Sequence, residues 1–187
     1  MSIEAVVLTG GRSERMGSDK AAMEVDGEPL GRRTARLLAE SGYSVTVLGK
    51  EPIDGFRFLE DVGQFEGPLS ALSRFQPSEE CVFVAACDMP RFDARIVKVL
   101  ASSLENSDAA IPFIASQLQP ACALYHARAW PRIPEMIVRG KRSLMAWIDS
   151  ISVRKIEEIE LQTHGLDPSD FRSANTPDEL KDILKKG

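Results

Sequence analysis

Short apolar segments alternate with helix-like segments along this chain, and that alternation limits the folds it can adopt. Residues 81–86 are apolar throughout, and residues 3–8 are apolar apart from Glu4. Continuous apolar runs of this length are typical of strands that are covered on both faces of a sheet. Helix-like segments between such runs are typical of the connections that join parallel strands. The sequence therefore predicts an α/β fold with three layers, in which helices flank a Rossmann-like, mainly parallel sheet.

The same patterns predict the individual elements. Strands are expected at residues 3–8, 45–48, 57–59, 81–86, 109–112 and 121–125, and helices at 29–41, 68–75 and 96–104. Helical turns are expected at 133–138 and 143–148, and an extended segment at 153–161. Thr176 is expected to cap a last helix that begins with Pro177. A length of 187 residues suits a single domain, 1–187.

The net charge and the cysteine content indicate which binding partners and which cellular compartment to expect. The formal net charge is −5, so a nucleic-acid partner is not expected. No apolar run approaches the ~20 residues that span a bilayer, and residues 1–4 lack the basic start of a secretory signal. Cys81, Cys87 and Cys122 stand in apolar segments, too widely spaced for a zinc motif, which predicts buried thiols. These features predict a cytoplasmic protein with no membrane partner.

The loop after the first expected strand carries paired glycines and several basic residues. Gly10 and Gly11 let the backbone approach a ligand closely, so that backbone amides can surround phosphate oxygens. Arg12, Arg15 and Lys20 add positive charge within an acidic protein. This combination fits a nucleoside triphosphate, whose charge must be neutralised as pyrophosphate leaves. The alternative is a surface loop with solvated charges.

The spacing in this loop differs from the best-known phosphate-binding motifs. Lys20 stands three residues after Gly17 and is followed by alanine, so the loop is not a P-loop. It also lacks the GxGxxG pattern of dinucleotide-binding proteins. A hydride-transfer enzyme is therefore disfavoured.

Two further loops are expected at the same edge of the sheet, because ligands of open α/β sheets bind beyond the carboxyl ends of the strands. Asp61 follows the strand at 57–59 and could contact a base or ribose, or it could be an ordinary loop acid. Gly67 precedes a proline-started helix, which predicts free amides at this edge. Asp88 follows the most apolar strand, where a carboxylate is costly to bury without a partner. Mg²⁺ is one such partner, and a role as a helix or turn cap is the alternative.

Taken together, these segments resemble the molybdenum cofactor guanylyltransferases, the MobA family. The first loop alone implies only a nucleotidyltransferase of the glycosyltransferase-A-like type, and later motifs narrow the resemblance over nearly the whole chain. In the family's order, the matching segments are Leu8-Thr9-Gly10-Gly11, Arg15-Met16-Gly17, Asp19-Lys20, Gly67-Pro68-Leu69, Cys87-Asp88-Met89-Pro90, Gln119-Pro120 and Asn175-Thr176-Pro177.

The resemblance implies a nucleotide-diphospho-sugar transferase fold and transfer of GMP from GTP to the terminal phosphate of molybdopterin, with Mg²⁺ as cofactor and pyrophosphate as product. It implies a nucleotide-binding half at residues 1–115 and an acceptor-binding half at 116–187. The implied nucleotide-binding residues are Leu8, Thr9, Gly10, Gly11, Lys20, Asp61 and Asp88. The implied catalytic residues are Lys20, Arg15 and Asp88, with Asp88 as the metal ligand, and the acceptor candidates are Arg15, Gly67, Arg142 and Asn175.

The chain also departs from the family pattern. Thr9 stands where alanine is commoner, Gly49 follows the second strand where an asparagine often helps to read guanine, and Ser173 replaces an asparagine. A cytidylyltransferase for the same pterin, a sugar-phosphate nucleotidyltransferase and a non-catalytic nucleotide-binding adaptor therefore stay open as alternatives. Expected partners are GTP, molybdopterin and molybdoenzyme-specific chaperones or cofactor-carrier proteins. His126 and His164 are expected to be structural or surface residues, because an anionic phosphate nucleophile needs no general base.

Overall fold

The computed structural model describes the chain apart from residues 11–20, 22, 62–66 and 186–187. The strands are β1 (Ile3–Leu8), β2 (Glu24–Val25), β3 (Glu28–Pro29), β4 (Ser44–Gly49), β5 (Arg57–Glu60), β6 (Cys81–Ala86), β7 (Ala109–Ile114), β8 (Gln117–Leu118), β9 (Cys122–His126) and β10 (Val153–Glu157). The α-helices are α1 (Leu30–Glu40), α2 (Pro68–Leu72), α3 (Ile96–Ser103), α4 (Arg132–Val138), α5 (Leu144–Ile148), α6 (Glu158–Thr163) and α7 (Pro177–Lys185). Two 3₁₀ turns, η3 (Ala127–Ala129) and η4 (Pro168–Phe171), complete the described elements.

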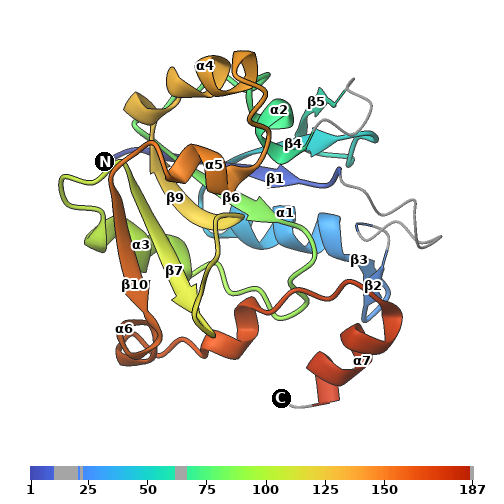
Figure 1. Cartoon of the computed structure of the whole chain (residues 1–187). Coiled ribbons are helices and arrows are strands. Elements are labelled where there is room, and N and C mark those ends of the chain that lie inside the picture. Colours follow the sequence, from blue (N-terminus) through green and yellow to red (C-terminus); the bar gives the residue numbers. More distant parts are fainter. Residues whose placement is uncertain (11–20, 22, 62–66, 186–187) are drawn as a thin grey trace.

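The main sheet has the strand order β10-β7-β9-β6-β1-β4-β5, with β8 paired to β7 off this path (Figure 1). β1 runs parallel to both β4 and β6, β4 is parallel to β5, and β10 is parallel to β7. Among the described strands of this main sheet, only β9, between β6 and β7, and the short β8 run antiparallel to their neighbours. The predicted mainly parallel sheet is therefore confirmed.

Helices cover both faces of this sheet, as the continuous apolar strands predict. Val7 of β1 packs with Leu38 of α1 and Leu100 of α3 on one face. Val6, its neighbour in the sequence, packs on the other face with the cluster beneath α2, α4 and α5, which includes Trp147. Alternate side chains of one strand thus enter separate apolar layers, which is why Val6 and Val7 are both fully buried. The result is the expected arrangement of three layers.

Most predicted elements occur within a few residues of their expected bounds, but the segment at 153–161 is not extended throughout. β10 ends at Glu157, and α6 begins at Glu158. The Glu157 side chain accepts a bond from the backbone of Glu160, whose own side chain accepts one from the Glu157 N–H. This reciprocal capping box starts a helix where apolar periodicity alone suggests a strand. α2 also ends earlier than predicted, at Leu72.

A small third cluster joins the C-terminus to a hairpin that the patterns did not predict. β2 and β3 form this two-stranded antiparallel hairpin. Its apolar residues pack with α7, and the members are Met23, Val25, Leu30, Ala174, Leu180 and Ile183. α7 itself begins at Pro177, and the Thr176 hydroxyl accepts a hydrogen bond from the Glu179 N–H, which confirms the predicted cap.

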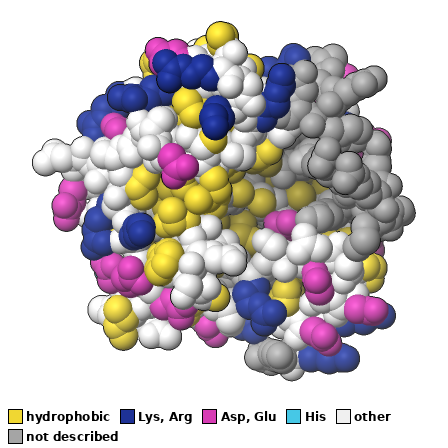
Figure 2. Space-filling model, in the orientation of Figure 1, with side chains coloured by type: hydrophobic (Ala, Val, Ile, Leu, Met, Phe, Trp, Pro, Cys, Tyr) yellow, Lys and Arg dark blue, Asp and Glu magenta, His cyan; other side chains and the backbone are white. Residues whose placement is uncertain are grey.

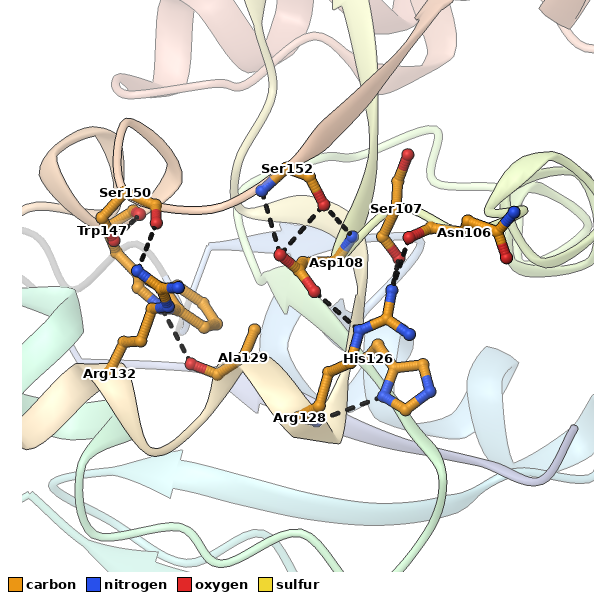
Figure 3. Close-up of polar contacts among 10 residues, drawn as sticks. All are labelled: Asn106, Ser107, Asp108, His126, Arg128, Ala129, Arg132, Trp147, Ser150 and Ser152. Atoms are coloured by element: carbon orange, nitrogen blue, oxygen red, sulfur yellow. Dashed lines mark hydrogen bonds and ion pairs between the residues drawn. The ribbon is translucent and has the colours of Figure 1, made fainter.

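At the amino edge of the parallel strands, Asp108 ties three segments together (Figure 3). Its carboxylate accepts bonds from the N–H and the hydroxyl of Ser152, at 3.0 and 2.9 Å, and from Arg128 Nε at 2.7 Å. Because Asp108 precedes β7, Ser152 precedes β10 and Arg128 follows β9, this group holds together the half of the sheet that contains β9. Its polar contacts lie at the edge opposite the carboxyl ends of β1 and β6.

The described part of the chain contains no helix with the length and apolarity needed to cross a membrane. The three cysteines are buried and form no disulfides, as predicted.

Candidate active site

The carboxyl ends of β1, β4, β5 and β6 meet at one edge of the sheet and bring the predicted loops together. Leu8 lies opposite Leu48 on one side and opposite Ala86 on the other. Hydrogen bonds continue this alignment beyond the strands: the Thr9 N–H donates to the Leu48 carbonyl (3.0 Å), and the Cys87 N–H donates to the Leu8 carbonyl (3.3 Å). The first residues of the loops after β1 and β6 are therefore neighbours.

Asp61 joins this edge from β5. Its N–H donates to the carbonyl oxygen of Gly49 at 2.7 Å. A Cβ placed on Gly10 would lie 3.5 Å from Asp61 Oδ2, so this carboxylate stands directly beside the Gly10 backbone. Gly10 and Asp61, both predicted to bind the nucleotide, are therefore neighbours. Gly10 offers an exposed backbone, and Asp61 offers a partly buried carboxylate.

Gly49 also belongs to this site, although the sequence marks it only as a departure from the family pattern after the second strand. A Cβ at position 49 would lie 2.0 Å from Thr9 Oγ1 and 3.2 Å from the Gly10 nitrogen. With Thr9 in this position, glycine at position 49 lets the start of the loop after β1 lie against the end of β4. The available signal was a glycine directly after the buried run at 45–48, but its meaning depends on a contact with a residue 40 positions away.

Asp88 lies two residues beyond β6 and is partly buried. Its backbone carbonyl accepts a hydrogen bond of 2.7 Å from the Ala174 N–H. The described residues contain no group of three or more His, Cys, Asp or Glu side chains placed to hold a metal ion. A single carboxylate nevertheless suits Mg²⁺, which prefers one or two carboxylates together with substrate oxygens and water. The donor set at Asp88 therefore fits a magnesium ion shared with a nucleotide.

Gly67 and Arg142 are in contact, and the hydrogen bonds around them contradict the prediction of free amides at the start of α2. Gly67 has a φ of +94°, and a Cβ there would lie 2.7 Å from the Arg142 carbonyl oxygen. That oxygen accepts the N–H of Leu69 (3.2 Å), and the Ser70 N–H donates to the Gly67 carbonyl (3.1 Å). The predicted free amides at the start of α2 are therefore wrong, because Pro68 has no N–H and the next two amides are bonded within the protein.

The other acceptor candidate in the described residues, Asn175, lies at a different place. Its neighbour Ala174 bonds to Asp88, and the Asn175 N–H donates to Glu179 Oε2 at 2.6 Å. Asn175 is exposed and follows the residue that contacts the Asp88 loop. Contacts thus place Gly67 with Arg142, and Asn175 beside Asp88.

Gly11, Arg15 and Lys20 lie outside the described residues. Both histidines lie at structural or surface positions, as predicted. His126 ends β9 at the amino edge of the parallel strands, where its Nδ1 accepts the Arg128 N–H, and His164 follows the last residue of α6.

Figure 2 shows the surface of the protein from the side drawn in Figure 1. Apolar side chains gather in a hollow near the centre of this face, lysine and arginine side chains stand around its upper and left rims, and a few acidic side chains lie beside it. An apolar floor with a basic rim suits a ligand that combines a flat organic group with phosphate.

Comparison with known proteins agrees with this geometry. Residues 5–156 match the family described as the MobA-like NTP transferase domain. A protein from Nostoc sp. named "Probable molybdenum cofactor guanylyltransferase" is 30% identical over 192 residues, which cover 96% of this chain and 89% of that protein. A protein of the same name from Clostridium perfringens is 27% identical, over 97% of this chain and 96% of its own.

Solved structures share the fold. Molybdopterin-guanine dinucleotide biosynthesis protein A from Archaeoglobus fulgidus superimposes with a TM-score of 0.78 at 22% identity, over 98% of this chain and 97% of that one. The 2-C-methyl-D-erythritol 4-phosphate cytidylyltransferase from Thermus thermophilus gives a TM-score of 0.73 at 16% identity, over 100% and 98% of the two chains. The sheet with flanking helices is thus the nucleotide-diphospho-sugar transferase fold. The family match over most of the chain and the Nostoc relative together show that this chain is a nucleotidyltransferase that belongs to the MobA-like NTP transferase family.

Proposed function

We propose that the protein transfers GMP from GTP to the terminal phosphate of molybdopterin and releases pyrophosphate. The observation that carries this proposal is the alignment of Leu8 with both Leu48 and Ala86, which brings Gly10, Asp61 and the Asp88 loop to one edge of the sheet. Relatives named for this guanylyltransferase activity cover nearly the whole chain, which supports the choice of GTP and of molybdopterin.

The reaction requires alignment and charge neutralisation more than proton transfer. An oxygen of the acceptor phosphate forms a bond to the α-phosphorus of GTP, and the bond from that phosphorus to the departing pyrophosphate breaks. The acceptor oxygen is already anionic near neutral pH, so no general base is needed. Two anionic substrates must nevertheless approach each other, and positive groups placed where charge develops lower that barrier.

Each candidate residue has a defined part in this proposal. The Gly10 and Gly11 backbone and Lys20 hold the triphosphate, and Lys20 stabilises the departing pyrophosphate. Asp61 contacts the nucleoside beside Gly10. Asp88 would hold Mg²⁺, which when bound would draw charge from the phosphate oxygens. Arg15 holds the incoming phosphate.

We assign binding of the acceptor mainly to the second half of the chain. Residues 1–115 supply the nucleotide site, and residues 116–187 supply most of the acceptor surface. Arg142 and Asn175 are the acceptor candidates in this second half, and Gly67 supports Arg142 by direct contact. The apolar hollow with its basic rim supports an acceptor that carries both a heterocycle and a phosphate (Figure 2).

We place the reaction in the cytoplasm, where buried cysteines without disulfides are usual. Chaperones of molybdoenzymes or cofactor-carrier proteins would then receive the product. Nucleic acid is not a proposed partner, since the chain is acidic.

The decisive experiment supplies the protein with Mg²⁺, molybdenum-loaded molybdopterin and each of the four ribonucleoside triphosphates in turn. Mass spectrometry identifies the product, and a coupled assay follows pyrophosphate. We expect a dinucleotide product only when GTP is the triphosphate supplied, and we expect that product to contain guanine. A product formed only with CTP would establish the cytidylyltransferase alternative, and nucleotide binding without pyrophosphate release would establish a non-catalytic role. Asp88→Asn serves as the control for catalysis at this site.

A further inference from the structure

The C-terminal segment contacts both sides of the candidate active site. Ala174 is fully buried, and its side chain belongs to the apolar cluster that α7 forms with the β2–β3 hairpin. Its N–H donates to the Asp88 carbonyl oxygen at 2.7 Å. A single residue therefore packs against the hairpin with its methyl group and holds the Asp88 loop with its backbone.

The hairpin end of this connection leads directly into the nucleotide loop. Met23 is three positions after Lys20 in the sequence, and the Leu30 N–H donates to its carbonyl at 2.8 Å. Gly31 follows at the start of α1, where a Cβ would lie 3.2 Å from Thr9 Cγ2 and 3.4 Å from Ala21 Cβ. Both ends of the loop that contains Lys20 are thus anchored near the start of α1.

Three further contacts fix the C-terminal segment itself. The Thr176 hydroxyl accepts a hydrogen bond from the Glu179 N–H, and Glu179 Oε2 accepts one from the Asn175 N–H. The turn before α7 and the first turn of that helix therefore hold each other through two hydrogen bonds. Just before this turn, Asp170 of η4 forms an ion pair with Arg91, with Asp170 Oδ1 2.6 Å from Arg91 Nε. Both side chains are largely shielded, at 27% and 17% exposure for Arg91 and Asp170, and Arg91 lies three residues after Asp88.

We propose that residues 170–183, which we call the C-terminal strap, position the Asp88 loop relative to the hairpin that ends the nucleotide loop. Ala174 and Leu180 are its positioning residues, and neither touches the reacting groups. The Arg91–Asp170 ion pair holds the same loop three residues after Asp88. The mechanical part of this proposal stands on the contacts alone, whereas its catalytic consequence rests on the proposed function.

The strap matters for catalysis because the reaction depends on alignment. A carboxylate on one loop and a cationic group on another must reach the same triphosphate. A displacement of about 1 Å can reduce the rate by ~10²-fold. A loosened strap should therefore lower kcat and raise the Mg²⁺ concentration needed for half-maximal rate, with the sheet still folded.

The test compares Leu180→Ala with Leu72→Ala. Both leucines are buried, at 7% and 0% exposure, but Leu72 ends α2 and packs in the cluster beneath α2, α4 and α5, which contains no residue of 87–92 or 23–30, whereas Leu180 packs in the hairpin cluster. Hydrogen–deuterium exchange of the full-length proteins, measured below the melting temperature of each, reports backbone protection at residues 87–92 and 23–30. We expect at least a tenfold loss of protection at both segments in Leu180→Ala and no change there in Leu72→Ala.

Two additional variants keep the test decisive if Leu180→Ala does not fold. Ile183→Val removes one methyl group from the hairpin cluster, and Ala174→Pro removes the N–H that Asp88 accepts. Ile183→Val should loosen both segments weakly, and Ala174→Pro should loosen residues 87–92 more than 23–30. Unchanged protection at residues 87–92 in the folded strap variants would overturn the proposal.

Activity gives the second measurement. In Leu180→Ala we expect kcat to fall by ten- to hundredfold and the half-maximal Mg²⁺ concentration to rise, while Leu72→Ala keeps both values. Equal kinetic losses in the two variants would refute the catalytic role of the strap. If the wild-type protein makes no product with any nucleoside triphosphate, the proposed function fails, and the exchange measurement still decides whether the strap holds the Asp88 loop.

Discussion

Replacing Gly49 with alanine tests how closely Thr9, the first residue after β1, lies against the end of β4. Since Gly49 is part of that strand, its backbone suits any residue, and alanine would otherwise stabilise the fold by about 0.4–1 kcal/mol by restricting the unfolded chain. The new Cβ would, however, lie 2.0 Å from Thr9 Oγ1. Relieving that overlap requires moving Thr9, and overpacking of this kind costs about 1–3 kcal/mol. We therefore expect Gly49→Ala to be destabilised.

A double-mutant cycle identifies the cause. Thr9→Ala removes Oγ1, which leaves the Thr9 Cβ and the Gly10 nitrogen, each at 3.2 Å, as the closest atoms to a Cβ at position 49. The double variant should therefore recover part of the loss, with an interaction energy of about 0.5–3 kcal/mol between the two substitutions. Urea unfolding of the four proteins measures these energies, and GTP binding should weaken in Gly49→Ala and recover in the double variant. Strictly additive energies, or a Gly49→Ala protein as stable as the wild type, would refute the steric explanation.

Three other expectations follow from the same contacts. Asp88→Asn should lower the rate of pyrophosphate release by about 10²–10³-fold, with an unchanged melting temperature; a normal rate in the folded variant would contradict the metal role. Burial raises the pKa of Asp108, but hydrogen bonds from Arg128 and the neighbouring serine outweigh it and lower that pKa from 3.8 to about 2. This carboxylate therefore stabilises the fold above pH 3.8, and the contribution is lost as the pH falls toward 2; acid unfolding of Asp108→Asn should depend less on pH in that window, and an unchanged slope would argue against it. Gly67→Ala should destabilise the protein by about 1–3 kcal/mol, because position 67 has a φ of +94° and a Cβ there would meet a backbone oxygen at 2.7 Å; thermal unfolding measures this, and wild-type stability would show that the loop can move.

Much of the fold could be predicted because its signals are local. The run at 81–86 is apolar throughout, and it forms the buried central strand β6 with the predicted bounds. Pro177 and Thr176 mark the start of α7 with residues whose preferences act within one turn. The prediction of an extended segment at 153–161 was wrong at its end, because two local signals compete there. Apolar patterning favours a strand, but the capping box formed by Glu157 and Glu160 starts a helix at Glu158.

The candidate site was only partly predictable. Asp61 and Asp88 stand out because each carboxylate directly follows a strand or lies two residues beyond one. The bonding of the Leu69 amide at the start of α2 could not be foreseen, because its acceptor is the carbonyl of Arg142, more than 70 residues away in the sequence. Gly49 and Ala174 carry no chemical group of interest, and their importance lies entirely in what packs against them.

The order of apolar and polar residues by itself determined the layered sheet, the ends of most elements and the edge at which a nucleotide would bind, since burial and capping act on neighbouring residues. Only the tertiary structure decided which loops touch. It set the Asp61 carboxylate beside Gly10, closed the start of α2 with Arg142, and joined Asp88 to the C-terminal segment through Ala174. Such contacts depend on the register of distant strands and on the space between backbones, and no local pattern of residues encodes either quantity.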